Sequence, residues 1–205
     1  MAIYKETKDY KLIHDNMLNM GDYIADGTID CVITDPPYEL GFMGKKWDGS
    51  GIAFNVDAWR KCFNALKDGG YLLAFGGTRT FHRIACAIED VGFEIRDTIM
   101  YLYGSGFPKS LDISKAIDKM MGAEREVVGK HQQPAKSIYT QTQVEMSKDV
   151  DITAPATDEV KQWKGWGTAL KPAYEPIIVA RKPMKTSVAE NVLKNRVGGI
   201  NIDEC

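Results

Sequence analysis

Residues that commonly bind metals or form disulfides are few in this sequence, and they lie far apart. No Cys-x-x-Cys pair occurs, and the histidines show no ligand spacing. The sequence therefore predicts neither a zinc site nor a disulfide framework, and no metal. The scattered thiols fit reduced, mostly buried side chains in a cytoplasmic protein. The cysteines and histidines are Cys31, Cys62, Cys86, Cys205, His14, His82 and His131.

Long apolar runs and an excess of positive charge are also missing. No apolar stretch reaches the length of a secretory core or a membrane span, so we expect a soluble chain without a membrane partner. The 26 Lys and Arg against 28 Asp and Glu give a formal net charge of -2, which excludes a uniformly basic nucleic-acid coat. With 205 residues and 44% hydrophobic content, the chain can still bury one sizeable core.

Apolar periodicity predicts an α/β chain in which strands and helices alternate. The continuous apolar run at 29–34 is typical of a strand buried on both faces of a parallel sheet. Helical spacing at 56–66 and 80–91 indicates two helices, which we expect to end at Gly69-Gly70 and Gly92. This alternation predicts right-handed crossovers. Further predictions are strands at 10–14, 71–75, 93–103 and 175–180, helices from Met17, at 111–121 and at 188–193, a mobile loop at 39–51 and a long surface loop at 129–160.

The tetrapeptide Asp35-Pro36-Pro37-Tyr38 follows the apolar strand with no turn residues between them. An ionised Asp35 and the Pro36 carbonyl are hydrogen-bond acceptors that can hold an exocyclic amine and stabilise it as it attacks. The prolines, Pro36 and Pro37, fix φ, so the loop is ordered before substrate arrives. Tyr38 offers a flat face for a base taken out of a duplex. The alternative is a rigid turn in which Tyr38 simply packs.

These residues resemble the catalytic motif of the S-adenosylmethionine-dependent amino-group DNA methyltransferases. The resemblance extends through 69–77, 104–110 and 171–183, and it is greatest to bacterial and bacteriophage members whose catalytic half comes first. The Asp form of the motif implies methylation of adenine N6. The resemblance also implies a partial Rossmann-like methyltransferase fold with a mostly parallel sheet and a long loop insertion.

In this family an acidic residue before the catalytic strand helps to hold the cofactor, and Asp15 occupies that place. Asp15, Asp35 and Gly76 are therefore the predicted residues for S-adenosylmethionine. A helix N-cap explains Asp15-Asn16 equally well, and Gly76-Gly77 fits an ordinary strand-to-helix loop. Members of this kind usually continue into a half with a glycine turn for the cofactor. Gly198-Gly199 does not substitute for that turn, so we expect the half that grips the cofactor to be missing.

A basic and aromatic stretch at 161–185 is the predicted contact with double-stranded DNA. Lysines bind phosphate without reading sequence, and aromatic rings stack on unpaired bases. In the alternative interpretation the two tryptophans close the core at a sheet edge and the lysines form a solvated rim. The predicted contact residues are Trp163, Lys164, Trp166, Lys171 and Tyr174, and Glu175 is the single acid in the stretch.

The sequence thus predicts one methyltransferase catalytic domain over 1–205, with an α/β core at 1–104, a loop-rich insertion at 105–170 and a final strand and C-terminal segment at 171–205. The expected function is DNA adenine N6 methylation in the cytoplasm of a bacterium or a phage-infected host. The main alternative is a non-catalytic or split fragment that binds DNA or a complementing chain. A homodimer is a further possibility, because missing strands would leave an exposed sheet edge. Cytosine N4, RNA and a protein glutamine amide are the alternative substrates.

Overall fold

The chain forms two compact units in the computed structural model, which describes residues 3–41, 46–104, 110–132, 149–170 and 173–205. Unit 1 comprises Met1–Ser105 and Ala173–Cys205, and unit 2 comprises Gly106–Pro172. Within the described ranges, no helix is both long and apolar enough to cross a bilayer.

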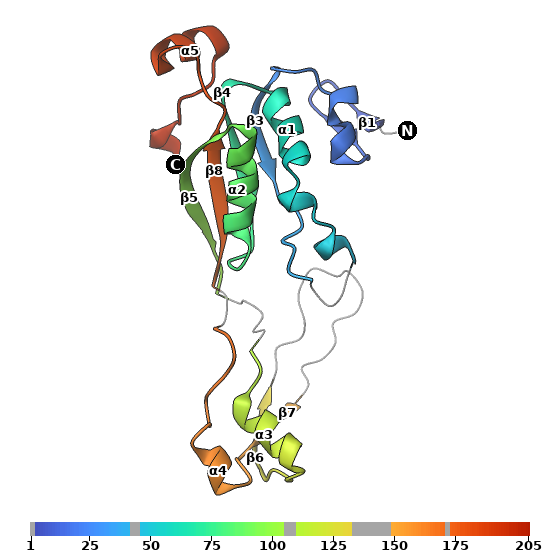
Figure 1. Cartoon of the computed structure of the whole chain (residues 1–205), viewed down its shortest axis with the longest axis vertical. Coiled ribbons are helices and arrows are strands. Elements are labelled where there is room, and N and C mark those ends of the chain that lie inside the picture. The colour runs from blue at the N-terminus through green and yellow to red at the C-terminus, as the bar shows by residue number, and fades with distance from the viewer. Residues whose placement is uncertain (1–2, 42–45, 105–109, 133–148, 171–172) are drawn as a thin grey trace. The chain divides into compact units, whose positions relative to one another are not determined.

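A four-stranded sheet forms the centre of unit 1 (Figure 1). Its order is β3 (Ile29–Thr34), β4 (Leu66–Phe75), β8 (Tyr174–Arg181) and β5 (Glu94–Leu102). Strands β3 and β4 pair in parallel, whereas β8 runs antiparallel to both β4 and β5. The predicted α/β, partial Rossmann-like class is confirmed, with the qualification that the sheet is mixed. A late strand separates β4 from β5, which sequence order alone would have placed side by side.

Helices α1 (Val56–Ala65) and α2 (Phe81–Val91) cover one face of this sheet (Figure 1). Alternate residues of the central strands point toward the helices, and full burial of each large aliphatic side chain contributes about 1.5–3 kcal/mol. The core residues of this layer are Leu72, Ala74, Ile178 and Ala180 from the sheet and Trp59, Cys62, Ile84, Ala87, Ile88 and Val91 from the helices.

Both helices form where the periodicity predicts them, but one of the two predicted ends is wrong. Asn55 caps α1 by accepting a hydrogen bond from the Asp57 backbone N–H. The helix ends at Ala65 because Leu66 is extended, and β4 then runs through Gly69-Gly70. Helix α2 ends as predicted at Gly92, whose φ of 115° suits a residue without a Cβ.

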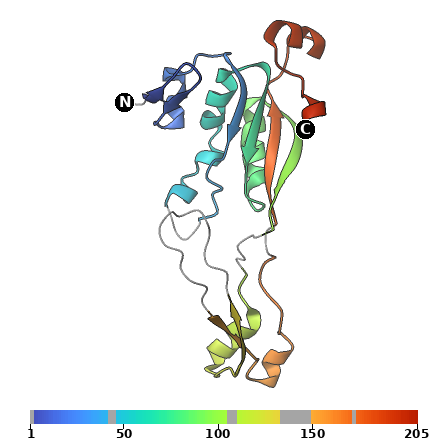
Figure 2. The ribbon, with the colours of Figure 1, turned by 180° about the vertical axis from the view of Figure 1, so that it is seen from behind.

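The expectation that 29–34 is buried on both faces is wrong. Strand β3 is an edge strand of the four-stranded sheet, and Ile33 is 69% exposed. Ile33 pairs with Leu73, so it lies on the face opposite the core residue Leu72. The view from behind looks onto that face, which no helix of the described ranges covers (Figure 2). The thiols also differ from expectation, because only Cys62 is buried among the four cysteines.

Shorter elements complete unit 1. An antiparallel hairpin of β1 (Ile3–Glu6) and β2 (Lys11–Ile13) precedes the 3-10 helix η1 (Met17–Asp22). After β8, α5 (Val188–Asn195) begins with a capping box in which Ser187 and Glu190 bond each other's backbone. The buried Asn191 amide donates to the carbonyls of Asp68 and Val197, which fastens α5 to the start of β4. The remaining 3-10 helices are η3 (Lys46–Gly49), η4 (Ile52–Phe54) and η5 (Ile202–Glu204).

Unit 2 contains α3 (Ile113–Met121), an antiparallel pair of β6 (Val127–Gln132) and β7 (Asp149–Thr153), and α4 (Asp158–Lys161). The prediction of a long surface loop at 129–160 is therefore wrong where the chain is described, and 133–148 lies outside the described residues. The buried carboxylate of Asp118 forms an ion pair with Arg125, which also donates to Thr153. These long-range contacts organise a segment whose polar composition shows little periodicity.

Candidate active site

Three segments distant in sequence meet at one end of the sheet in unit 1, where strands β3 and β4 finish. The Asp35–Tyr38 motif follows β3, and Gly76-Gly77 follows β4. Because β8 runs antiparallel to β4, its first residues lie at this same end of the sheet. The Gly76 N–H accordingly donates to the Pro176 carbonyl at 3.0 Å. The carboxyl ends of parallel strands are the usual place for ligand sites in open α/β sheets.

Tyr38 is half-buried and held from three directions. The Thr80 hydroxyl, at the start of α2, donates to the Tyr38 carbonyl at 2.6 Å. The Tyr38 hydroxyl donates to Glu175 Oε2 at 3.1 Å. A Cβ added at Gly77 would lie 3.3 Å from Tyr38 Cδ2, so a glycine there lets the strand end approach the ring. The last residue of the motif is thus fixed before any substrate binds.

The electrostatics of the motif keep the Tyr38 phenol neutral. Burial raises the pKa of the Tyr38 hydroxyl well above its ordinary value, and hydrogen bonding and charge from Asp35, with the charge of Glu175, raise it further. Asp35 itself is exposed and can accept hydrogen bonds from a ligand. The site therefore presents one accessible carboxylate with a neutral phenol beside it.

The loop after the motif is closed at its base by Glu39. This residue has a φ of 55°, a left-handed conformation that is uncommon for a side chain with a Cβ. Its carboxylate accepts hydrogen bonds from the Gly51 N–H at 2.8 Å and the Ala53 N–H at 3.3 Å. The predicted mobile loop at 39–51 thus has a structured base, and 42–45 lie outside the described residues.

Two of the residues predicted to hold a cofactor have roles within the fold. Asp15 Oδ1 accepts from the Asn16 N–H and the Asn19 amide, and Oδ2 accepts from the Tyr23 hydroxyl at 2.6 Å. These bonds lower the pKa of the Asp15 carboxyl, with the Tyr23 bond the largest cause. The N-cap of η1 is Asn16, which accepts from the Leu18 N–H. The role of Asp15 toward a cofactor stays a prediction.

Gly76 allows β4 to approach α2 closely. A Cβ added there would lie 2.9 Å from the Phe81 Cβ, which is closer than side chains pack. This contact explains why a glycine stands at the strand end, and any contact of Gly76 with a cofactor stays a prediction.

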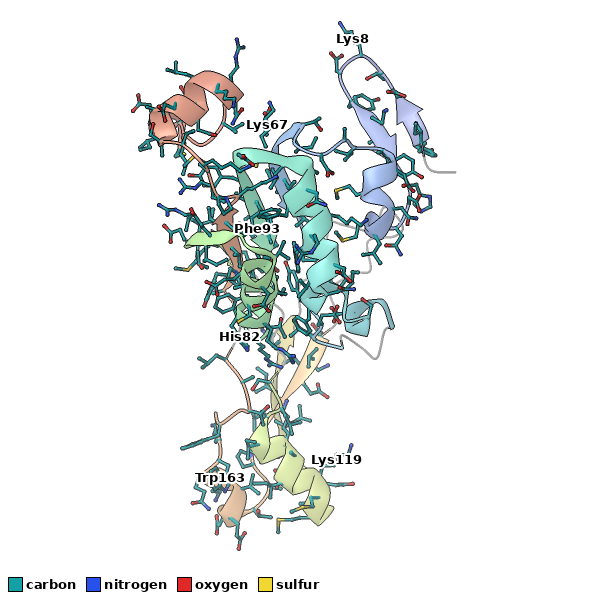
Figure 3. The ribbon with its side chains drawn as sticks, turned by 45° about the horizontal axis from the view of Figure 1, so that its top comes forward. Lys8, Lys67, His82, Phe93, Lys119 and Trp163 are labelled. Carbon is teal, nitrogen blue, oxygen red and sulfur yellow. The ribbon has the colours of Figure 1, made fainter. Side chains whose placement is uncertain are left out.

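The residues predicted to contact DNA are divided between the two units. In unit 2, Trp163 lies beside α4 (Figure 3), and its ring meets that of Trp166 edge-on with 5.3 Å between the centroids. Trp166 is 59% exposed, and Lys164 is also exposed. Tyr174 lies at the start of β8 in unit 1 and is 36% exposed. Lys171 lies outside the described residues.

Not all the cations of the basic stretch are available to a ligand. Arg181 forms an ion pair with Glu94, and Lys182 donates to the Leu66 carbonyl and lies over the Phe63 ring. These two side chains stabilise unit 1. A shallow pocket of about 570 Å³ lies in unit 2 beside the exposed Trp166 ring, lined by Ser110, Asp112, Gly165, Trp166, Gly167, Thr168, Ala169 and Leu170.

Sequence reasoning missed three polar residues of the site at this end of the sheet: Thr80, Tyr103 and Glu175. Glu175 was visible as the only acid in a basic stretch, at the start of an apolar strand. It pairs with Tyr101 on β5. Burial raises the pKa of the Tyr103 hydroxyl, and the negative charge of Glu175 raises this pKa further. Thr80 gave no distinct signal because threonine is common at helix starts. In the described residues, no group of three His, Cys, Asp or Glu side chains is placed to hold a metal ion.

Comparison with known proteins places this arrangement in context. A family model described as DNA methylase, of N6 and N4 type, matches residues 29–199. The Type II methyltransferase M.HindIII of Haemophilus influenzae is 27% identical over 150 residues, covering 71% of this chain and 38% of the relative. The Type II methyltransferase M.HpaI of Haemophilus parainfluenzae is 28% identical over 119 residues, covering 55% of this chain and 38% of the relative. This chain therefore spans well under half the length of these curated relatives.

Solved structures also resemble the chain at low identity. TTHA0409 of Thermus thermophilus, in complex with S-adenosyl-L-methionine, matches with a TM-score of 0.40 and 14% identity, over 89% of this chain and 58% of that one. The complex of M1.HpyAVI with S-adenosylmethionine matches with a TM-score of 0.36 and 13% identity, over 76% of this chain and 45% of that one.

Proposed function

This chain belongs to the DNA methylase family, and we propose that it takes part in methyl transfer from S-adenosylmethionine to N6 of adenine in DNA. The observation that carries the proposal is the Asp35–Tyr38 motif at the carboxyl end of β3, with Asp35 exposed and Tyr38 held by Thr80 and Glu175. S-adenosylmethionine is the methyl donor that the family implies, and the solved complexes of TTHA0409 and M1.HpyAVI each contain it.

Asp35 and the Pro36 carbonyl accept hydrogen bonds from the amine, as their acceptor chemistry allows. The amine nitrogen forms a bond to the methyl carbon while the carbon–sulfur bond breaks and its electron pair stays on sulfur. The nitrogen then loses its surplus proton to solvent beside Asp35. Holding the two reactants in line supplies most of the rate enhancement in such a site, and no covalent enzyme intermediate is required.

Trp163, Lys164, Trp166, Lys171 and Tyr174 are the proposed contacts to DNA. The exposed indole of Trp166 is available for stacking on an unpaired base, and Lys164 is available to a phosphate. Asp15, Asp35 and Gly76 are the proposed residues toward the methyl donor. Asp35 has the strongest support among these three, because Asp15 and Gly76 already have partners within the fold.

A second candidate is a catalytic portion that works with a complementing polypeptide or a second copy of the chain. Strand β3 pairs only with β4 in the described residues, and this open edge favours the alternative, because unpaired edges invite further strands. The short span relative to the curated relatives also agrees with it.

The test is transfer of a labelled methyl group from S-adenosylmethionine to unmethylated DNA, followed by digestion and identification of the labelled base. Asp35→Ala should lower kcat by about a hundredfold or more if the carboxylate acts in the transition state. Asp30→Ala is the matched control, because Asp30 is an exposed carboxylate on the same strand that pairs with Lys67. Label on adenine that persists in Asp35→Ala contradicts the mechanism, and label on cytosine contradicts the adenine assignment. DNA binding without transfer supports the second candidate.

A further inference from the structure

Glu39 directly follows the Asp35–Tyr38 motif and turns the chain at its end. Its φ of 55° lies in the left-handed region, which few residues with a Cβ adopt. Such residues persist where surrounding contacts hold them in place, and they cluster at functional sites. Glu39 is half-buried, and its carboxylate makes the contacts that hold this conformation.

The carboxylate of Glu39 caps the 3-10 helix η4. Gly51 is the N-cap residue of η4, and it has no side chain to bind the first amides of the helix. Glu39 Oε2 accepts from the Gly51 N–H at 2.8 Å, and Oε1 accepts from the Ala53 N–H at 3.3 Å and the Ser50 hydroxyl at 3.4 Å. A residue 12 positions before the N-cap thus satisfies the amides that an N-cap side chain ordinarily binds.

Helix η4 is in turn anchored in the core of unit 1. Ala53 is buried, and its carbonyl accepts the indole N–H of the buried Trp59, on α1, at 2.9 Å. The guanidinium of Arg83, on α2, lies 4.6 Å from the centroid of the Phe54 ring. Glu39 therefore ties the end of the motif to a short helix that α1 and α2 both hold.

The motif is thus fixed at both of its ends. The last residue of β3, just before the motif, pairs with β4. Between the two ends, the rings of Pro36 and Pro37 fix φ, so few backbone rotations remain free. Release of Glu39 would therefore reorient the residues before it, including the exposed Asp35.

We propose that Glu39 is a positioning residue, whose carboxylate fixes the end of the Asp35–Tyr38 motif on η4 and thereby sets the direction of Asp35 toward the substrate amine. The inference rests on the proposed function. The oxygens of Glu39 already accept from Gly51 and Ala53, so its action on the substrate is through Asp35. The orientation of a reacting group affects the rate of the chemical step, so we expect the effect in kcat.

Three substitutions of Glu39 separate the carboxylate from the backbone conformation. Glu39→Ala removes the acceptors and should lower kcat about tenfold or more with little change in KM, because a small misplacement of a reacting group strongly slows the reaction. Glu39→Gly also removes them but adopts a positive φ freely, so its kcat should fall by a similar factor. Glu39→Gln keeps the length and one acceptor oxygen, and its kcat should stay within about threefold of native.

Glu190→Ala is the matched control. The Glu190 carboxylate also accepts a backbone N–H at a helix start, from Ser187 at 3.1 Å. Its helix, α5, is fastened to the start of β4, at the opposite end of the sheet from the motif. The control should lose stability and keep the native kcat, and urea unfolding shows whether each assayed variant is folded.

Three outcomes of these assays overturn the proposal. Native kcat in Glu39→Ala would show that the carboxylate acts on stability alone. Native kcat in Glu39→Gly, with a loss in Glu39→Ala, would show that the backbone conformation suffices. An equal loss of kcat in Glu190→Ala would show that any lost helix cap slows the enzyme.

Amide NMR spectra supply a readout that does not depend on catalysis. In Glu39→Ala the Gly51 and Ala53 amide signals should shift, because these groups lose their acceptor. The Asp35 amide signal should shift as well, and by more than in Glu39→Gln. An unchanged Asp35 signal contradicts the positioning role, whether or not the chain transfers a methyl group. A native chain that transfers no methyl group, with the expected shifts in the variants, contradicts the proposed function alone.

Discussion

The Thr80 hydroxyl donates to the Tyr38 carbonyl at 2.6 Å, although Thr80 is the N-cap residue of α2. An N-cap threonine ordinarily accepts from a backbone N–H in the first turn, and Thr80 makes no such side-chain bond. The hydroxyl fastens the motif loop instead of the helix. The start of α2 and the end of the Asp35–Tyr38 motif are thus held together as one structure.

Thr80→Ala should lower the free energy of unfolding by about 1–2 kcal/mol, because it leaves the half-buried Tyr38 carbonyl without this donor. Thr80→Ser keeps the hydroxyl and should lie within about 0.5 kcal/mol of native. Urea denaturation measures both values, with an unchanged m-value as the sign that only stability has changed. Equal stability of the two variants would show that the hydrogen bond contributes nothing.

Gly76→Ala should destabilise the chain by about 1–3 kcal/mol, because the new methyl group would overlap the Phe81 Cβ at 2.9 Å. Gly21→Ala is the matched control, since a Cβ there meets nothing within 4 Å. The control should be neutral or stabilising, because alanine restricts the unfolded chain more than glycine does. Thermal or urea unfolding checks the difference, and similar effects of the two substitutions would contradict the packing argument.

Asp118→Asn should destabilise unit 2 by about 3 kcal/mol or more, because it leaves the Arg125 guanidinium buried without its counter-charge. Asp158→Asn removes a carboxylate from the exposed pair with Lys161 and should leave stability close to native, because solvent screens such a pair. Hydrogen exchange of the α3 amides reports the opening of unit 2 directly. Unaltered exchange in Asp118→Asn would show that the buried pair does not stabilise this unit.

Cys62 should resist alkylation at neutral pH while the exposed Cys86 reacts. Burial raises the pKa of the Cys62 thiol from 9.0 to about 11, and the thiolate is the reactive form. Because the folded-state pKa lies above the unfolded value, this thiol stabilises the fold below about pH 9, and that contribution is lost as the pH rises toward 11. Mass spectrometry after iodoacetamide treatment identifies the modified cysteines. Modification of Cys62 as fast as Cys86 would indicate that the core around it opens readily.

Lys164→Ala should weaken DNA binding for all sequences alike and reduce the slope of log affinity against log salt by about 1, as expected for one lost phosphate contact. Lys119→Ala is the control, because Lys119 is also exposed in unit 2 but lies on α3, outside the basic stretch. Fluorescence anisotropy with labelled duplex at several salt concentrations measures both slopes. The same slope in both variants would assign Lys164 to the solvated rim.

Most elements could be predicted because their signals are local. The periodicity of Phe81, Ile84, Ile88 and Val91 defines the face that α2 buries, and Gly92 ends that helix where predicted. The prediction was wrong for β6 and β7, because Arg125 contacts Thr153 across 28 positions of sequence, and no local pattern indicates that contact. It was also wrong for Ile33, because strand composition does not reveal whether another layer covers the strand.

The site was only partly predictable. The motif was evident because four unusual residues are consecutive after a strand. Tyr38 was predicted to offer its ring to a base, and that role remains a prediction, whereas its hydroxyl makes a contact that no local pattern indicates. The lysines of the basic stretch could not be told apart by sequence, because Lys182 and Lys164 differ only in what the fold places beside them.

By itself, the sequence determined the type and approximate bounds of the main helices and strands and the position of the Asp35–Tyr38 motif at a strand end. These properties depend on residues within a few positions of one another. The tertiary structure decided the order of the strands, the antiparallel insertion of β8, and with it the meeting of Tyr38 and Glu175. Pairing between distant strands depends on long-range hydrogen bonds and shared burial, for which the local pattern of residues contains no signal.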